Sequence, residues 1–364
     1  MKILEILDYI YQEFSSIPKD FLTEIHLRFF KQNKNPDKKI LGVWDFNQRL
    51  SRLGDFIGFL EILNVLIEEF NLNNQINKKI DICFIDDENH YNRKQLRFSK
   101  SYIFKKNLKL LTITNPRIDS ILIFSSNAEF NYFYQKNRKR YIRWPPTIAS
   151  TNAIDYRIVT KFHAKNEYIP QLIIPPEILI KIYEFYNSKI FPSMPIILNL
   201  RKNIRSINRN SNLLEIKKFL KHYENNKKYK FIIICNKSEI PDDFRKLKNI
   251  YFSKDYFDSI EYDLGLIKSS FLSIFPSSGM ACFAWFSNVP FIQFGEHSSK
   301  KYTGLKKGQT YNFFSKYQRH YHHKETKEWL ISVFEKLIEE LEKNEVNNTF
   351  ENDTKLDLKQ DYLF

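Results

Sequence analysis

The stretch that decides the fold runs from Phe271 to Gly295 and reads FLSIFPSSGMACFAWFSNVPFIQFG. An apolar run typical of a buried strand is followed by a tight Ser-Ser-Gly turn at 277–279, a short apolar helix, and a second apolar strand after Pro290. In a parallel sheet, such a turn places backbone N–H groups and hydroxyls beyond the carboxyl end of a strand, where an anion such as phosphate is favoured. The sequence therefore predicts a ligand-binding turn.

Strands and helices alternate on both sides of this stretch. In the second half we expect strands at 195–201, 230–235, 249–252, 271–275 and 291–294, separated by helices at 213–225, 242–248 and 256–268. In the first half we expect strands at 39–46, 80–85 and 120–124, with helices at 55–70 and 127–138. The strands are continuous apolar runs, as in a buried parallel sheet. The pattern predicts an α/β protein with two Rossmann-like, doubly wound domains facing a cleft.

The chain divides into six segments at shifts in this pattern. A polar run and two Pro-Pro pairs supply the boundaries, and residues 139–175 read as irregular. The segments are an N-terminal helical lead-in at 1–38, a first Rossmann-like domain at 39–150, an inter-domain crossing at 151–190 with a helix at 177–188, a second Rossmann-like domain at 191–322, a closing helix at 323–344 and a polar tail at 345–364.

Composition narrows the class of protein and its partners. The three cysteines, Cys83, Cys235 and Cys282, lie far apart with no CxxC spacing, which argues against a disulfide framework or a structural zinc site and for a reducing compartment. No signal peptide or membrane-spanning stretch is evident, so we expect a cytoplasmic protein. The net charge of +15 suits an acidic partner, although the Lys-, Asn- and Ile-rich bias of an AT-rich genome would produce it equally well.

Two motifs together give the chain a resemblance to a known family. Gly54-Asp55 opens an apolar helix after the first strand, and the Ser-Ser-Gly turn leads through Cys282 and Ala284 to a strand ending in Phe294-Gly295. This resembles the GT-B glycosyltransferases, nearest to the heptosyltransferase-type branch. The sequence departs from that branch in two places, since Ser277 stands where the family has an acid and Cys282 where it has His. The triplet Asn199-Leu200-Arg201 is also similar to the diphosphate-binding strand end of GDP-fucose-type transferases.

The resemblance implies a glycosyltransferase that moves a sugar from a nucleotide-sugar donor to a bacterial surface-glycan acceptor of lipopolysaccharide or capsule type. It implies no cofactor and no metal ion. The first domain would hold the acceptor, an acidic glycan or glycolipid, and the second the donor. The basic charge would then suit a peripheral position on the inner face of the cytoplasmic membrane.

The same resemblance places Asp55 as the general base that takes the proton of the acceptor hydroxyl. Asp55 could instead be a plain helix N-cap, and Asp45 is the second candidate base. Donor contacts are expected from Arg201 and Arg205, whose guanidinium groups match phosphate oxygens, and from the turn residues Ser277, Ser278, Gly279 and Met280. A solvated basic loop is the alternative for the arginines, above all for Arg205, and a tight turn with N-cap serines is the alternative for the turn.

Two further groups of residues suggest other functions. The run from Tyr134 to Tyr141 interleaves basic and aromatic residues, which would suit a nucleic-acid-binding protein, but no recognised DNA- or RNA-binding motif accompanies it and nucleic acid is the disfavoured partner. The histidines at 320, 322 and 323 resemble metal ligands, yet no matching acid or cysteine spacing supports them, so a surface loop near the cleft is expected. A GT-B-shaped protein that only binds a glycan is a third possibility.

Overall fold

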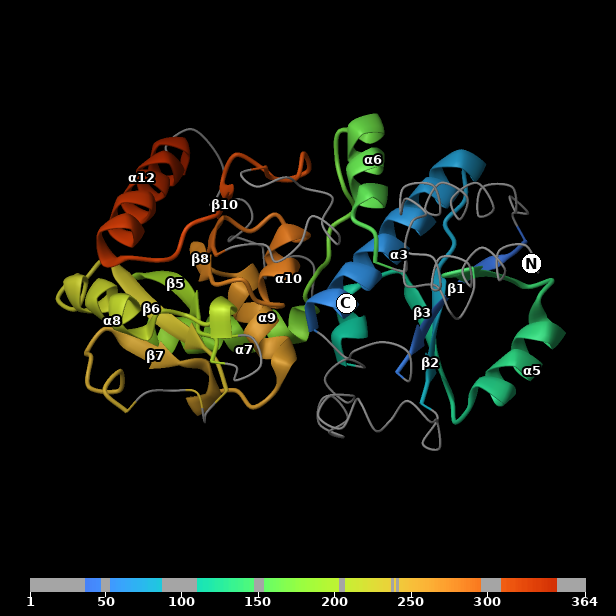
Figure 1. Ribbon diagram of the computed structural model, residues 1–364, viewed down its shortest axis with the longest axis horizontal. Helices are drawn as coiled ribbons and strands as arrows, with labels where there is room; N and C mark the ends of the chain where they lie inside the picture. The colour runs from blue at the N-terminus through green and yellow to red at the C-terminus, as the bar shows by residue number, and fades with distance from the viewer. Residues whose placement is uncertain are drawn as a thin grey trace.

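The computed structural model of the protein describes residues 37–46, 53–86, 110–146, 154–202, 207–236, 239, 242–295 and 309–345. The N-terminal lead-in up to residue 36 and the tail from residue 346 lie outside these residues. Two parallel sheets lie side by side, one from each half of the chain (Figure 1). No helix among the described residues has the length and apolarity needed to cross a membrane.

The first sheet has the strand order β3-β2-β1-β4, with every pair parallel. Its strands are β1 (Lys39–Asp45), β2 (Ile80–Ile85), β3 (Ile118–Phe124) and β4 (Tyr141–Trp144). All of β2 and nearly all of β1 are buried, as their continuous apolar runs predict for central strands covered on both faces. The strand order reverses direction between β1 and β4, and the carboxyl ends of strands at such a switch point are where open α/β sheets bind ligands.

The second sheet has the order β10-β9-β8-β5-β6-β7 and is also parallel throughout. Its strands are β5 (Met194–Asn199), β6 (Tyr229–Ile234), β7 (Ile250–Phe252), β8 (Leu272–Phe275), β9 (Phe291–Phe294) and β10 (Gln318–Tyr321). Counted along the chain, this is the order of a complete Rossmann sheet, with its switch point between β5 and β8. The expected fold class, two Rossmann-like halves, is confirmed.

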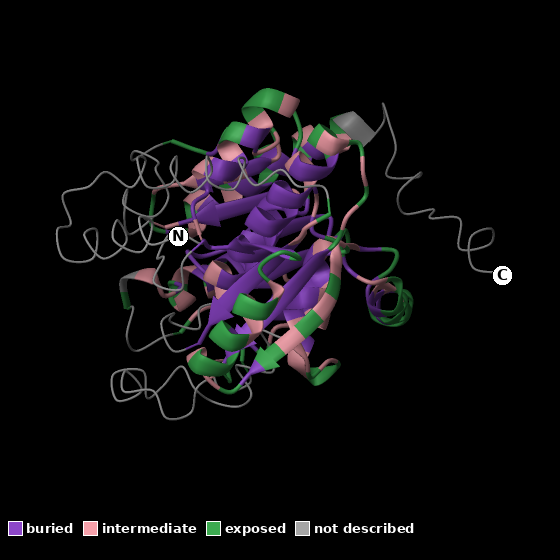
Figure 2. Cartoon of the chain, turned by 90° about the vertical axis from the view of Figure 1, so that its right-hand side faces the viewer, coloured by how far each residue is buried: buried purple, intermediate pink, exposed green. Residues whose placement is uncertain are grey.

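Helices cover both faces of each sheet. They are α3 (Leu53–Asn74), α5 (Asn127–Asn137), α6 (Arg157–Asn166), α7 (Pro176–Lys189), α8 (Leu213–His222), α9 (Ile260–Lys268), α10 (Ala281–Trp285) and α12 (Lys327–Glu345). α8 and α12 contact each other on one face of the second sheet, and α7 contacts α9 on the other. Figure 2 shows the buried strands enclosed by helices whose outer residues are exposed.

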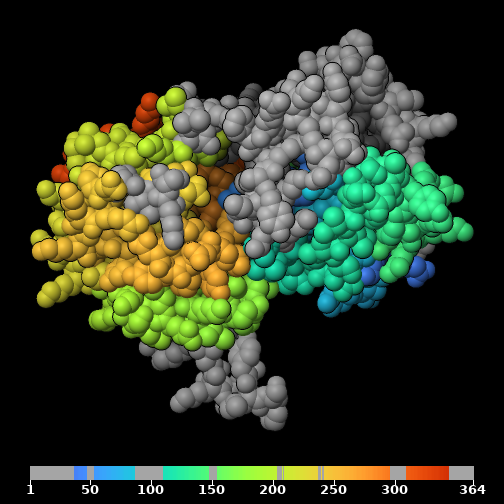
Figure 3. Space-filling view, turned by 90° about the horizontal axis from the view of Figure 1, so that it is seen from below, coloured from blue at the N-terminus to red at the C-terminus, as the bar shows by residue number. Residues whose placement is uncertain are grey.

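One apolar core joins the two sheets. It runs from Ile40 and Trp44 in β1 through the buried face of α3 to Phe283 in α10 and Phe275 in β8. α3 contacts both α6 and α10, and the two lobes adjoin along the middle of the molecule (Figure 3). α3 therefore follows a strand of the first sheet in the sequence and also forms the contact with the second lobe.

Three expectations about elements were wrong. Residues 139–175, expected to be irregular, contain β4 and α6. In β4, the side chain of Arg143 is buried and donates hydrogen bonds to the carbonyl oxygens of Pro145 and Pro146. The helix expected near 242–248 is a series of turns. The histidine-containing loop expected at 320–323 begins as the edge strand β10, in which His320 is buried.

Candidate functional site

The turn at 277–279 lies at the switch point of the second sheet, directly after β8. Ser277 and Ser278 are only 5% and 9% exposed. The Oγ atom of Ser278 is buried and has no hydrogen-bond partner among the described residues. Because buried hydroxyls are nearly always hydrogen-bonded, this one marks a position where a water molecule or ligand could supply the missing partner.

Arg209 fixes the position of this turn. Its Nε atom donates to the carbonyl oxygen of Ser277 at 3.0 Å and to the Ser277 Oγ at 3.2 Å. Arg209 belongs to the loop after β5, the other strand at the switch point. α10 is only five residues long, so its dipole is short, and the positive charge at the turn comes chiefly from this guanidinium.

The loop that carries Arg209 is closed at its base by two hydrogen bonds. The backbone N–H of Arg201 donates to Ser211 Oγ at 3.0 Å, and the backbone N–H of Ser211 donates to the Arg201 carbonyl oxygen at 3.0 Å. Arg201, one of the predicted donor contacts, is half-buried at this base. Arg205, the other predicted arginine, lies outside the described residues. The loop thus brings at least Arg201 and Arg209 to the carboxyl edge of the second sheet.

The first turn of α3 approaches the same place from the other lobe. A Cβ atom added to Gly279 would lie 2.6 Å from the backbone N of Gly54, and one added to Gly54 would lie 2.9 Å from Cys282 Sγ. Only glycine permits this approach of the two backbones. Asp55, the predicted base, follows Gly54 in the first turn of α3 and is half-buried, and its charge acts on the Cys282 thiol of the other lobe.

Tyr156 and Cys282 lie beneath this contact. The Tyr156 hydroxyl lies beside the Cys282 thiol, and the ring packs against Trp285 and Phe286 of the second lobe. Burial raises the pKa of Tyr156 well above its ordinary value, and it raises the pKa of Cys282 to about 12; the charge of Asp55 acts in the same direction on both. Both groups therefore stay protonated at neutral pH, and Cys282 acts as a buried packing residue rather than a nucleophile.

Asp45, the second candidate base, lies elsewhere. It is the last residue of β1, is 2% exposed, and is near enough to Cys83 for its charge to raise the pKa of that buried thiol. Cys83 is a buried residue of β2, so the surroundings of Asp45 belong to the interior of the first sheet. Asp55, by contrast, is at the contact between the lobes, which makes it the better placed of the two acids.

Of the three histidines, His320 lies in β10 and is hydrogen-bonded to the residue that follows β9. His320 Nε2 donates to the carbonyl oxygen of Gly295 at 3.1 Å, and burial lowers the pKa of His320 to about 4, so the ring is neutral. Gly295, the residue after β9, has a φ of +105°. A Cβ atom added to it would lie 3.5 Å from the Cβ atom of Ser277. The described residues contain no group of three His, Cys, Asp or Glu side chains arranged to hold a metal.

Sequence reasoning missed two residues of this site. Arg209 had one signal, its place at the end of the basic run that starts at Arg201 after a buried strand. Tyr156 had none, because its partners Gly58 and Cys282 are far from it in the sequence and are brought to it only by the contact of α3 with α10.

Comparison with known proteins identifies the fold. No protein-family model matches the sequence, and no curated protein matches it at a significant level. Among solved structures, the chain is similar to the ADP-heptose lipopolysaccharide heptosyltransferase II of E. coli, with a TM-score of 0.52, 11% identity, and coverage of 84% of this chain and 99% of that one. It is also similar to a glycosyl transferase of family 9 from Veillonella parvula, with a TM-score of 0.51, 11% identity, and coverage of 82% and 89%.

These similarities extend over both lobes and agree with the resemblance that Gly54-Asp55 and the Ser277–Gly279 turn suggested. At such low identity they establish the architecture and leave the chemistry to the residues of the site. The chain has the two-domain GT-B fold of the heptosyltransferase-type glycosyltransferases.

Proposed function

We propose that the protein is a glycosyltransferase that moves a sugar from a nucleotide-sugar donor to a hydroxyl group of a bacterial surface-glycan acceptor, without a metal ion. One observation carries this proposal. The first turn of α3 and the loop after β5 come from different lobes and both reach the Ser277–Gly279 turn: the backbone of Gly54, next to Asp55, lies against Gly279, and Arg209 donates hydrogen bonds to Ser277.

The donor diphosphate would lie against this turn. Arg209, hydrogen-bonded to Ser277 through Nε, brings its positive charge to the turn, and Arg201 lies at the base of the same loop. The unsatisfied Ser278 hydroxyl would contribute a neutral hydrogen bond. As the bond between the sugar and the diphosphate breaks, negative charge grows on the leaving phosphate, and fixed guanidinium groups stabilise that charge without a metal ion.

Asp55 would act on the acceptor. Its carboxylate accepts the proton of the acceptor hydroxyl while the hydroxyl oxygen bonds to the anomeric carbon of the donor sugar, and the nucleoside diphosphate leaves with the electrons of the broken C–O bond. The position of Asp55 in the first turn of α3 suits this role, because α3 is a 22-residue helix packed on both sides and holds the carboxylate in place. The basic charge of the chain would favour an acidic glycan or glycolipid as acceptor, near an anionic membrane surface.

A thermal-shift panel of UDP-, GDP-, ADP- and CMP-sugars tests the donor half of this proposal, because only a ligand that binds the folded state raises the melting temperature. We expect one nucleotide to stabilise the wild-type protein and to lose that effect in the Arg209→Ala variant. The matched control Lys227→Ala removes an exposed positive charge of the same lobe and should respond as wild type.

The donor identified in this way is then assayed for sugar transfer and for slow donor hydrolysis. Turnover of the donor supports an enzyme. Binding without any turnover would instead support a GT-B-shaped protein that only binds its ligand, and a panel in which no nucleotide-sugar binds would overturn the proposal.

A further inference from the structure

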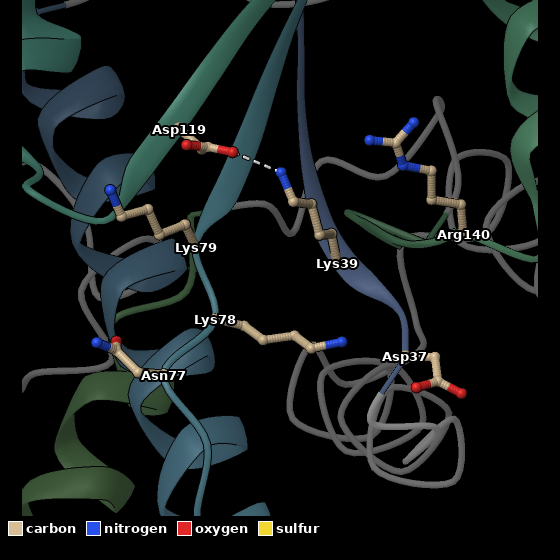
Figure 4. A pocket seen from close by; sticks show the side chains of 7 residues that line it. All are labelled: Asp37, Lys39, Asn77, Lys78, Lys79, Asp119 and Arg140. Atoms are coloured by element: carbon tan, nitrogen blue, oxygen red, sulfur yellow. Dashed lines mark hydrogen bonds and ion pairs between the residues drawn. The ribbon is translucent and has the colours of Figure 1, made fainter.

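A second group of charged residues gathers at the amino edge of the first sheet. Here the strands begin, whereas the candidate site lies beyond the carboxyl ends. Figure 4 shows the pocket of about 390 Å³ that these residues line. The lining residues are Asp37, Lys39, Asn77, Lys78, Lys79, Asp119 and Arg140. They come from the starts of all four strands of the sheet, so the fold itself brings them together.

The floor of the pocket is a fixed hydrogen-bonded network. Lys39 Nζ donates to Asp119 at 2.6 Å and to Asp81 at 3.3 Å, and the buried Tyr141 hydroxyl donates to Asp81 at 2.7 Å. The hydrogen bond to Asp119 is the main reason that the pKa of Lys39 is raised. Asp81 is 2% exposed, so its charge is compensated within the protein, and the floor is already satisfied without a ligand.

The rim is different, because its lysine and arginine side chains take no part in this hydrogen-bonded network. Lys78, Lys79 and Arg140 make no ion pair within the described part of the chain. Figure 4 shows Lys78 and Arg140 extending from opposite sides into the space in front of Lys39. The neighbouring Lys38, Arg138 and Lys139 add further positive charge to the same edge, and Asp37 and Asp119 are the carboxylates among the lining residues.

This arrangement sets the chemistry of a ligand. The guanidinium group of Arg140 and the ammonium group of Lys78 on either side of an open space attract an anion, and a guanidinium fork with a lysine beside it matches the oxygens of phosphate. The hollow has the volume of a small-molecule site and is open to solvent. It also gives a role to the basic run that ends at Tyr141, which the cleft does not use.

We propose that this amino-edge pocket is a second anion-binding site, which takes the phosphate groups of a small ligand at the edge of the first sheet opposite Asp55. The proposal is independent of the glycosyltransferase function, since none of its residues belongs to the candidate donor site.

Calorimetric titration with inorganic pyrophosphate tests the site. We expect the wild-type protein to bind pyrophosphate and the Lys78→Ala/Arg140→Ala variant to bind it about tenfold or more weakly, because two charge-assisted contacts are lost. The control Lys227→Ala/Lys248→Ala removes the same charge from exposed positions of the second lobe and should bind as wild type. All three proteins should share one melting temperature, since Arg140 is exposed, Lys78 is partly exposed, and neither forms an ion pair within the described part of the chain.

A second arm distinguishes the source of the phosphate. If free pyrophosphate does not bind but vesicles of phosphatidylcholine with phosphatidylglycerol do, and the double variant loses that binding while the control keeps it, the site takes a lipid headgroup. Equal pyrophosphate binding by wild type and double variant, with loss only in Arg209→Ala, would place the anion at the turn after β8 and overturn the proposal. So would the absence of all binding, or binding of oligonucleotides alone.

Discussion

At the residue scale, Asp55 and Arg209 show how the candidate site would draw on two lobes. Asp55 owes its position to two glycines, because Gly54 and Gly279 let the start of α3 meet the turn after β8 at backbone distance. Arg209 owes its position to the closed loop between Arg201 and Ser211. Both positions therefore depend on these specific backbone contacts.

Replacing Asp55 with Asn should abolish transfer and leave donor binding intact. Asn keeps the size of the side chain but cannot accept a proton at neutral pH, and loss of a general base typically costs 10²–10⁴-fold in rate. We expect kcat to fall by about that factor while the thermal shift produced by the donor stays the same. The rate is measured as release of the nucleoside diphosphate.

Glu184→Gln is the matched control, because it removes one carboxylate from an exposed position of α7. It should retain wild-type turnover. An Asp55→Asn protein that turned over at the wild-type rate would remove Asp55 from the role of base, and Asp45 would be the next acid to test.

The residue scale also shows what a sequence can reveal of a site. Gly54-Asp55 and the Ser277–Gly279 turn could be identified because each is a local signal, a polar or glycine-rich break between apolar elements. That the two turns touch could not be predicted from either. Arg209 and Tyr156 depend on loop closure and on contacts between distant segments, and no local pattern encodes these.

At the element scale, α3 is the helix that links the two lobes, and it carries an acid where none is expected. Glu61 is fully buried, and its pKa is raised well above 4.5 by burial, with the Asn64 side chain and the charge of Arg117 offsetting only part of that effect. The carboxyl group therefore stays protonated in the folded protein at a pH where it ionises in the unfolded chain.

This difference should make stability depend on pH. Because the folded pKa is raised, the contribution of Glu61 is fully present below pH 4.5 and is lost as the pH rises through the folded pKa. Glu61→Gln, which cannot ionise, should therefore be more stable than wild type at neutral pH, by about 1.4 kcal/mol for each unit by which the pKa is raised. The advantage should vanish at acid pH.

Urea unfolding at several pH values measures this effect, and Glu184→Gln on the surface of α7 serves again as the control. A Glu61→Gln variant whose advantage over wild type did not change with pH would show that burial does not control the protonation of Glu61.

The elements that sequence reasoning missed share a physical cause. β4 has four residues, includes Arg143 and ends before a Pro-Pro pair, and β10 reads Gln-Arg-His-Tyr. Both are strands because a neighbouring strand supplies their hydrogen bonds and because tertiary packing buries their polar side chains, as the contact of His320 with Gly295 illustrates. The long apolar strands β1, β2, β5 and β6 needed no such help, and their position in the sequence was predicted closely.

At the scale of the whole molecule, the two lobes are joined by an apolar core rather than by a polar contact. Domains within one chain usually meet through modest, fairly polar interfaces and move relative to each other. Here buried residues continue from Trp44 and Phe56 through α10 to Phe291, and the ring of Tyr156 packs against Trp285 and Phe286 across the contact. The strand order of each sheet and this shared core are global properties that no single stretch of the sequence specifies.

The shared core should make the two lobes unfold together. We expect scanning calorimetry to show one transition, with a calorimetric enthalpy equal to the van't Hoff enthalpy.

Gly54→Val should break this coupling, because its Cβ would lie 2.9 Å from Cys282 Sγ and 3.0 Å from Gly279 Cα, so the lobes must move apart. We expect that variant to melt at a lower temperature and in two steps. Gly265→Ala, whose Cβ meets the side chains of Ile178, Ile182 and Ile174 at 3.0 Å or more, is the control and should keep the single transition. Two resolved transitions in the wild-type protein would show that the lobes are independent, and that the meeting of Asp55 with the turn after β8 is one position of a mobile pair rather than a fixed feature of the fold.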